Sequence, residues 1–160
     1  MTSGSSPDTP RRAILFVCLG NICRSPLAEG VFLHLARERG LDPTLQVDSA
    51  GTGGWHVGNP PDPRAQAVAR ENGVILGSRA RQVHPGDAEA FDLILAMDRA
   101  NLADLRRHLP PGGRAELRLF RDFDPTASPE DQAEVPDPYY GGPEGFQEVY
   151  AMVHRSCEAL

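Results

Sequence analysis

The run AILFV at residues 13–17 restricts the fold more than any other part of the sequence. Uninterrupted apolar residues, rich in branched and aromatic side chains, are typical of a strand that is covered on both faces, as in a parallel sheet. Beyond it, Ser25 is a good helix N-cap and Pro26 a good first helical residue, so we expect a helix that stops near Gly40. This buried strand and its helix are expected to form the centre of the core.

The remainder of the chain repeats this order of strands and helices. Further strands are expected at residues 45–51, 91–98 and 114–120, and further helices at residues 62–72, 99–108 and 146–159. Residues 122–143 form a long loop, of a length that is usually functional or disordered. The alternation indicates an α/β doubly wound fold, in which ligands bind at the carboxyl ends of the strands.

Length and composition indicate a single domain. A chain of 160 residues is long enough to bury about two thirds of its unfolded surface. Residues 1–11 are small, polar and interrupted by proline, so we expect a disordered N-terminal tail, followed by one domain at residues 12–160. We expect a monomer, because the sequence has no obvious exposed apolar stripe.

Charge and hydropathy argue against two kinds of partner. The net charge of −6 gives no reason to expect nucleic acid, which usually meets a basic face. A membrane is not expected either, because no apolar run approaches the ~20 residues that span a bilayer. No leader pattern precedes the cysteines, and their odd number, three, favours the reducing cytoplasm.

The turn between the first strand and its helix is suited to an oxyanion. Cys18 and Arg24 are separated by five residues, the spacing of a Cys-x5-Arg loop. Successive backbone N–H groups in such a loop can form a nest, to which the helix dipole adds positive charge. Gly20 and Asn21 tolerate backbone angles that help a short loop direct its N–H groups inward. No Walker pattern is present, so this is not an ATP-binding loop of that kind.

The side chains of this loop suit a nucleophile that attacks phosphorus. The guanidinium of Arg24 presents a planar fork that can bind two phosphate oxygens. A helix N-terminus and an arginine both stabilise a thiolate, so we expect an ionised Cys18, steadied by the Ser25 hydroxyl. Two alternatives make Cys18 and Cys23 either buried structural residues or zinc ligands. The first leaves the arginine and the Ser-Pro unexplained, and the second lacks another Cys or His pair nearby.

The long loop contains a candidate general acid, which a thiolate needs in order to expel an alkoxide or phenoxide. This candidate is Asp137, because flanking prolines stiffen its loop and Tyr139 and Tyr140 follow it. Trp55, the only tryptophan, lies in the loop GGWHVG, where an aromatic side chain is often directed at a ligand. The alternatives are an ordinary turn at Asp137 and a cover over the core at Trp55. The histidines receive no role.

Together these features resemble the low-molecular-weight protein tyrosine phosphatases, from about Ala13 to the C-terminus. The likeness is carried by FVCLGNICRSP, DSAGT at residues 48–52, Trp55, PDPRA at residues 61–65, AMDRAN at residues 96–101 and DPYYG at residues 137–141. The resemblance implies a three-layer fold, in which a four-stranded parallel sheet has helices on both faces. It also implies a metal-independent hydrolase without a cofactor, which acts on phosphotyrosine in proteins through a cysteinyl-phosphate intermediate.

The same resemblance assigns the central roles. Cys18 matches the nucleophile, Arg24 the phosphate clamp, and Asp137 the general acid that later acts as a base. The implied binding loop for phosphate and other oxyanions comprises Leu19, Gly20, Asn21, Ile22, Cys23, Arg24 and Ser25. The implied substrate cleft comprises Trp55, Tyr139 and Tyr140.

The resemblance also implies supporting roles and one departure. Asn21 and Ser49 match a pair that holds the loop by hydrogen bonding, and Ser25 matches the hydroxyl that supports the thiolate. Cys23 matches a cysteine that forms a reversible disulfide with the nucleophile on oxidation, which would make the enzyme redox-sensitive. Ser78 stands where some members have a histidine that braces the loop.

Three other functions compete with this interpretation. Protein-arginine phosphatases of the same family tend to have threonine where this chain has Ile22, and they lack the paired tyrosines. An arsenate reductase needs further thiols to relay electrons, and Cys157 has no partner beside it in the last predicted helix. A non-catalytic anion-binding module would be expected to lose Cys18 or Asp137.

Overall fold

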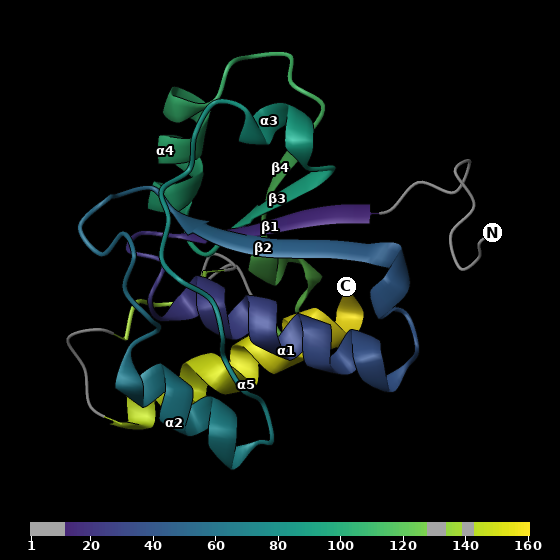
Figure 1. The fold of residues 1–160 in the computed structure, drawn as a ribbon, viewed down its shortest axis with the longest axis vertical. Helices are drawn as coiled ribbons and strands as arrows, with labels where there is room; N and C mark the ends of the chain where they lie inside the picture. Colours follow the sequence, from purple (N-terminus) through teal and green to yellow (C-terminus); the bar gives the residue numbers. More distant parts are fainter. Residues whose placement is uncertain (1–11, 128–133, 139–142) are drawn as a thin grey trace.

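The computed structural model describes residues 12–127, 134–138 and 143–160 (Figure 1). Its strands are β1 (Arg12–Cys18), β2 (Leu45–Gly51), β3 (Leu93–Ala96) and β4 (Glu116–Leu119). Its helices are α1 (Arg24–Glu38), α2 (Pro63–Glu71), α3 (Asp87–Ala90), α4 (Arg99–His108) and α5 (Pro143–Ala159), with short 3-10 helices η1 (Asp42–Thr44) and η2 (Phe120–Phe123). The expected tail, residues 1–11, lies outside the described residues.

The strands form one parallel sheet in the order β2-β1-β3-β4. Ile14 of β1 is opposite Val47 of β2 on one side and Leu93 of β3 on the other, and Leu93 is opposite Glu116 of β4. Figure 1 shows α1, α2 and α5 below the sheet and α3 and α4 above it. This arrangement confirms the predicted doubly wound fold of three layers, with helices on both faces.

The position of β1 explains why its sequence is apolar without interruption. One set of alternate residues, Ala13, Leu15 and Val17, packs in a core with residues of α3 and α4. The other set, Ile14, Phe16 and Cys18, packs in a second core with residues of α1, α2 and α5. None of these side chains is more than 3% exposed. Both faces of the central strand are therefore buried, as the apolar run predicted.

Several element boundaries differ from the sequence-based expectation because side chains and turns end the strands early. β3 covers Leu93–Ala96 instead of residues 91–98, since Phe91 follows α3, a short helix that the pattern does not predict. At the other end of β3, the Asp98 carboxylate accepts the Asn101 N–H and starts α4. β4 passes directly into η2, and α5 begins at Pro143, three residues before the predicted start.

Candidate active site

The loop that joins β1 to α1 lies at the carboxyl edge of the sheet. Two backbone hydrogen bonds of 2.9 Å join it to the loop after β2, from Thr52 N–H to the Cys18 carbonyl and from Gly53 N–H to the Leu19 carbonyl. The approach is so close that a Cβ atom at Gly51 would lie 2.7 Å from the Leu19 carbonyl oxygen. A glycine at the end of β2 therefore lets the neighbouring strand support the loop.

Asn21 holds this loop in its curved shape. Its φ of 59° is in the left-handed region, where no other non-glycine residue of the described chain lies. The buried side chain donates through Nδ2 to Ser25 Oγ at 2.8 Å and to Ser49 Oγ at 3.0 Å. Its Oδ1 accepts the backbone N–H of Arg81 at 2.9 Å, which fixes the orientation of the amide. The structure thus brings together the residues that the resemblance grouped as loop supports.

These contacts set the direction of a hydrogen-bond chain that ends at Cys18. Because Asn21 donates to both serine hydroxyls, each serine directs its own proton to another acceptor. Ser25 Oγ lies 3.0 Å from Cys18 Sγ and 3.5 Å from the Ala50 carbonyl oxygen, so the sulfur is the nearer acceptor. The backbone N–H of Asn21 is a second donor, 3.3 Å from the same sulfur. Two hydrogen-bond donors are therefore directed at Cys18 Sγ.

Glu29 lies at the other end of this hydrogen-bond chain, and no motif in the sequence predicted its role. Ser49 Oγ donates its proton to Glu29 Oε1 at 2.6 Å. Burial raises the pKa of Glu29, and the hydrogen bond from Ser49 opposes that effect. The signal that could have identified it is spacing, since Glu29 lies four residues after Ser25 in α1 and the two share a helix face.

Arg24 is almost completely buried, with 2% of its side chain exposed. Its Nη1 donates to Asp98 Oδ2 at 2.7 Å and to the Val135 carbonyl at 3.0 Å. Burial alone would lower the pKa of Arg24, but the charge of Cys18 and the hydrogen bond to Asp98 raise it above its ordinary value. The guanidinium is therefore a fixed cation directly behind the loop. The sequence analysis quoted Asp98 within AMDRAN but assigned it no role.

Asp137 faces this guanidinium from the segment of residues 134–138. Its Oδ2 lies 3.6 Å from Arg24 Nη2, and its side chain is 37% exposed. The segment is anchored by Val135, whose side chain is fully buried and whose N–H donates to the Met97 carbonyl at 2.7 Å. A partly exposed carboxyl group is thus held close to the buried cation.

A cavity of about 310 Å³ opens over these groups. It is lined by Cys18, Leu19, Gly20, Ile22, Cys23, Arg24, Trp55, His56 and Asp137. The structure therefore places the predicted nucleophile, clamp and acid on the wall of one cavity. The sequence analysis gave His56 no role, although its position beside Trp55 in a glycine-rich loop was a usable signal. Tyr139 and Tyr140 lie outside the described residues.

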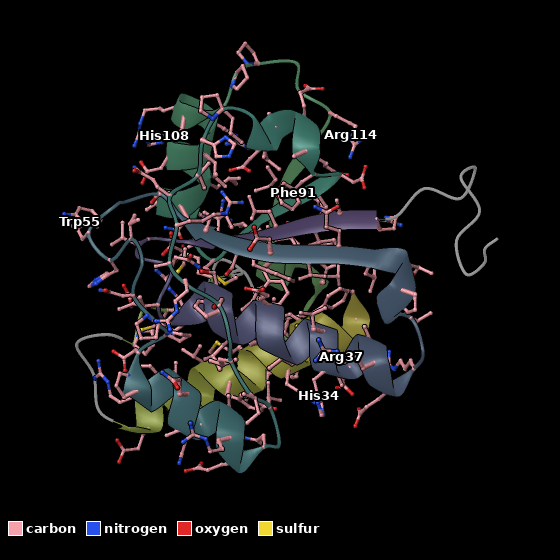
Figure 2. The ribbon with its side chains drawn as sticks, in the orientation of Figure 1. His34, Arg37, Trp55, Phe91, His108 and Arg114 are labelled. Atoms are coloured by element: carbon pink, nitrogen blue, oxygen red, sulfur yellow. The ribbon has the colours of Figure 1, made fainter. Side chains whose placement is uncertain are left out.

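Trp55 forms an outer wall of this cavity and is 73% exposed. Figure 2 shows it at the edge of the molecule, projecting from the loop after β2. Its ring lies over the backbone at Gly53, where an added Cβ atom would be 1.9 Å from a ring carbon. The glycine therefore creates the space in which the ring rests.

The other two cysteines and Ser78 lie in three different settings. All three cysteines are free thiols. Burial, and then the nearby carboxylate of Asp62, raise the pKa of Cys23 far above its ordinary value. Cys157 is buried in α5, with Sγ 3.7 Å from the Ala28 carbonyl oxygen of α1. Ser78 lines a second cavity of about 410 Å³, together with Glu29.

Two further observations concern only the part of the chain that the structure describes. In these residues, no group of three or more His, Cys, Asp or Glu side chains is arranged to hold a metal ion. None of the helices there combines the length and hydropathy needed to cross a bilayer.

Comparison with known proteins agrees with this geometry. A family model described as low molecular weight phosphotyrosine protein phosphatase matches residues 13–160. The chain belongs to this family. A low molecular weight phosphotyrosine protein phosphatase of Schizosaccharomyces pombe is 48% identical over 141 residues, which is 88% of each chain. The protein of the same description from Homo sapiens is 41% identical over 151 residues, which is 93% of each chain.

Solved structures of similar proteins have the same fold. A protein tyrosine phosphatase from Entamoeba histolytica, with Hepes in its active site, is 38% identical, and the match covers 92% of this chain and 93% of that one, with a TM-score of 0.87. A Drosophila arginine phosphatase is 34% identical, and the match covers 91% and 93% of the two chains, with a TM-score of 0.84. The fold is therefore shared by members that are named for different phosphorylated residues.

Proposed function

We propose that this protein is a phosphotyrosine-protein phosphatase, which hydrolyses aryl phosphate monoesters through a cysteinyl-phosphate intermediate. The observation that carries the proposal is the joint position of Cys18, Arg24 and Asp137 on one cavity. A sulfur that accepts two hydrogen bonds, a buried guanidinium and a partly exposed carboxyl group are the groups that such a reaction needs. The names of the relatives support the same reaction class.

In the first step, Cys18 Sγ attacks phosphorus while the bond between phosphorus and the aryl oxygen breaks. Asp137, in its protonated form, gives its proton to the leaving oxygen, so the product is a neutral phenol. We assign the loop N–H groups and Arg24 to the phosphate oxygens. Because Asp98 and Val135 already occupy Nη1 of Arg24, the phosphate is assigned to Nε and Nη2.

In the second step, the Asp137 carboxylate accepts a proton from water, and the water oxygen attacks phosphorus. The bond between phosphorus and sulfur breaks, which releases inorganic phosphate and restores the thiolate. Ser25 and the Asn21 N–H stabilise that thiolate as the leaving group, through the contacts of 3.0 and 3.3 Å to Sγ. The hydrogen-bond chain behind the loop therefore serves both steps.

The substrate is proposed to be a phosphotyrosine side chain in a protein, whose ring would lie between Trp55 and the tyrosine pair Tyr139 and Tyr140. The exposed ring of Trp55 and the apolar Ile22 on the cavity wall support this assignment.

We further propose that residues 12–160 form one domain and that the protein is a monomer. We propose a cytoplasmic location, which three free thiols support. We also propose a regulatory disulfide between Cys18 and Cys23.

Steady-state hydrolysis of phosphotyrosine, phosphoserine and phosphoarginine in the presence of a metal chelator tests this function. We expect turnover of phosphotyrosine alone, and its loss in Cys18→Ser, because a hydroxyl is far less ionised than a thiol in the same place. Preference for phosphoarginine would keep the mechanism and reject the substrate assignment. Inactivity on all three, or full activity of Cys18→Ser, would reject the proposed reaction.

A further inference from the structure

Hydrogen bonds join Glu134 and Val135, three and two residues before Asp137, to the rest of the fold. The Val135 N–H donates to the Met97 carbonyl at 2.7 Å, and the Val135 carbonyl accepts from Arg24 Nη1 at 3.0 Å. The position of Val135 therefore bears on both the proposed acid and the phosphate clamp. Contacts that hold these two residues therefore restrict the positions that are open to Asp137 two residues later.

Arg121 of η2 binds the backbone of Glu134, the residue that precedes Val135. Its Nη1 donates to the Glu134 carbonyl at 2.9 Å, and its side chain is only 2% exposed. The same guanidinium donates through Nε to Asp124 Oδ2 at 2.9 Å. The Arg121 guanidinium thus binds both the buried Asp124 carboxylate and the backbone of residues 134–138, which include Asp137. On the other side, the Glu134 carboxylate accepts the Arg99 N–H at the start of α4, at 2.9 Å.

Asp124 keeps this guanidinium in a fixed orientation. Its fully buried carboxylate also accepts from Arg155 of α5, at 3.2 and 3.3 Å, and from the N–H and hydroxyl of Thr126, both at 2.9 Å. Burial would raise the pKa of Asp124, but these hydrogen bonds together lower it to about 2. The carboxylate is therefore charged under all ordinary conditions, and Arg121 has a permanent counter-ion.

Stability alone is a weak reason for such a cluster. Burying charged groups removes them from water, and well-packed apolar residues often give equal or greater stability in the same volume. An apolar side chain at position 121 would not donate to the Glu134 carbonyl. The feature that an arginine adds here is a directed hydrogen bond to the segment that carries Asp137.

We propose that Arg121 is a positioning residue, which holds Glu134 and Val135 so that Asp137 reaches the leaving oxygen of the substrate. Arg121 is not among the described residues that line the cavity, and it acts through the backbone of residues 134 and 135. The inference rests on the proposed function, since it requires Asp137 to be the general acid. Its consequence is a specific kinetic defect: loss of Arg121 impairs the substrates that need protonation of the leaving group.

The experiment compares kcat/KM for phenyl phosphate with kcat/KM for para-nitrophenyl phosphate, whose leaving group needs much less protonation. In Arg121→Ala we expect a loss of about tenfold for phenyl phosphate and of about twofold for the nitrophenyl ester, as for one misplaced hydrogen-bonding group. Asp137→Ala is the positive control and changes the ratio further. Arg155→Ala is the matched control, since Arg155 binds the same carboxylate and no contact to Glu134 is described for it; its ratio should stay that of the wild type.

Each outcome separates the inference from the proposed function. A wild-type protein that hydrolyses neither ester overturns the proposed function. If the wild type is active and the ratio of the two kcat/KM values changes in Asp137→Ala but not in Arg121→Ala, only the role of Arg121 is overturned. The same conclusion follows if Arg155→Ala changes this ratio as much as Arg121→Ala does. If circular dichroism shows Arg121→Ala unfolded, Arg121→Lys decides by the same ratio, because one ammonium cannot reproduce the planar fork that contacts both Asp124 and Glu134.

Discussion

Replacing Asp124 by asparagine should remove a measurable, pH-dependent part of the folding free energy. The pKa of this carboxyl falls from its ordinary value of 3.8 to about 2 in the folded protein. This difference corresponds to about 2 kcal/mol of unfolding free energy at neutral pH. Because the folded-state pKa is the lower one, that stabilisation is complete above the unfolded value and is lost as the pH falls toward the folded value. About half of it should be gone at about pH 3.

Asp124→Asn keeps the size of the side chain but removes its charge. At neutral pH the variant should be about 3 kcal/mol less stable than the wild type, since two arginines lose their counter-ion and Arg121 is buried beside it. The difference between the two proteins should shrink by about 1 kcal/mol when the pH is lowered from about 6 to about 3.

Urea unfolding followed by circular dichroism at several pH values measures both quantities. The matched control is Asp122→Asn in the 3-10 helix η2, which directly precedes Asp124, because the Asp122 side chain is 39% exposed and its contact with Arg118 is 3.9 Å long. A stability difference between wild type and Asp124→Asn that stays constant across the pH range would refute the reasoning. So would a control that shows the same pH dependence.

Three other substitutions test separate parts of the site. Glu29→Ala leaves the Ser49 proton without its acceptor and should lower kcat/KM about fivefold. Alkylation of Cys18 by iodoacetate, located by mass spectrometry, should slow in parallel. An unchanged alkylation rate would show that the hydrogen-bond chain does not influence the sulfur. Asp98→Asn keeps the cap of α4 but removes the carboxylate that orients Arg24 through a charge-assisted hydrogen bond of 2.7 Å, so inorganic phosphate should inhibit about tenfold more weakly. Equal inhibition of both proteins would contradict this. Gly53→Ala displaces the Trp55 ring, so KM for an aryl phosphate should rise. Inhibition by phosphate should stay the same, and the free energy of unfolding should change by less than about 0.5 kcal/mol. A parallel loss of phosphate binding would mean that the whole loop has moved.

Separation along the chain determines which parts of the site could be predicted from the sequence. Cys18, Arg24 and Ser25 lie in one loop, where the rules for helix starts and anion nests are local. Asp98 and Val135 reach Arg24 from 74 and 111 residues away, so their contacts depend on which strands are neighbours in the sheet. An aspartate followed by Arg-Ala-Asn predicts a helix cap, and the sequence does not show that the same carboxylate also binds Arg24.

The fold was more predictable than its boundaries for a similar reason. An apolar run such as residues 13–17 predicts a buried strand whatever its neighbours are. The ends of strands depend on single side chains, and Asp98 ends β3 by capping α4 two residues after Ala96. The sequence did not single out Arg121 either, because a charged residue that follows a strand usually lies on the surface.

Because both faces of β1 are apolar, burial of its side chains places little restriction on its register in the sheet. The loop that follows the strand restricts this register much more. In a strand with one polar face, a shift of one residue exposes apolar side chains to water, and the folding energy opposes it. A one-residue insertion within residues 13–17 would exchange the two buried faces and still present only apolar side chains to each core. Apolar burial alone therefore does not fix the register of β1, whereas the hydrogen bonds from the Thr52 and Gly53 N–H groups to the Cys18 and Leu19 carbonyls require a single register. The position of the sulfur at the edge of the sheet is therefore set by the loop and its contacts with the residues after β2, and not by the hydrophobicity of the strand.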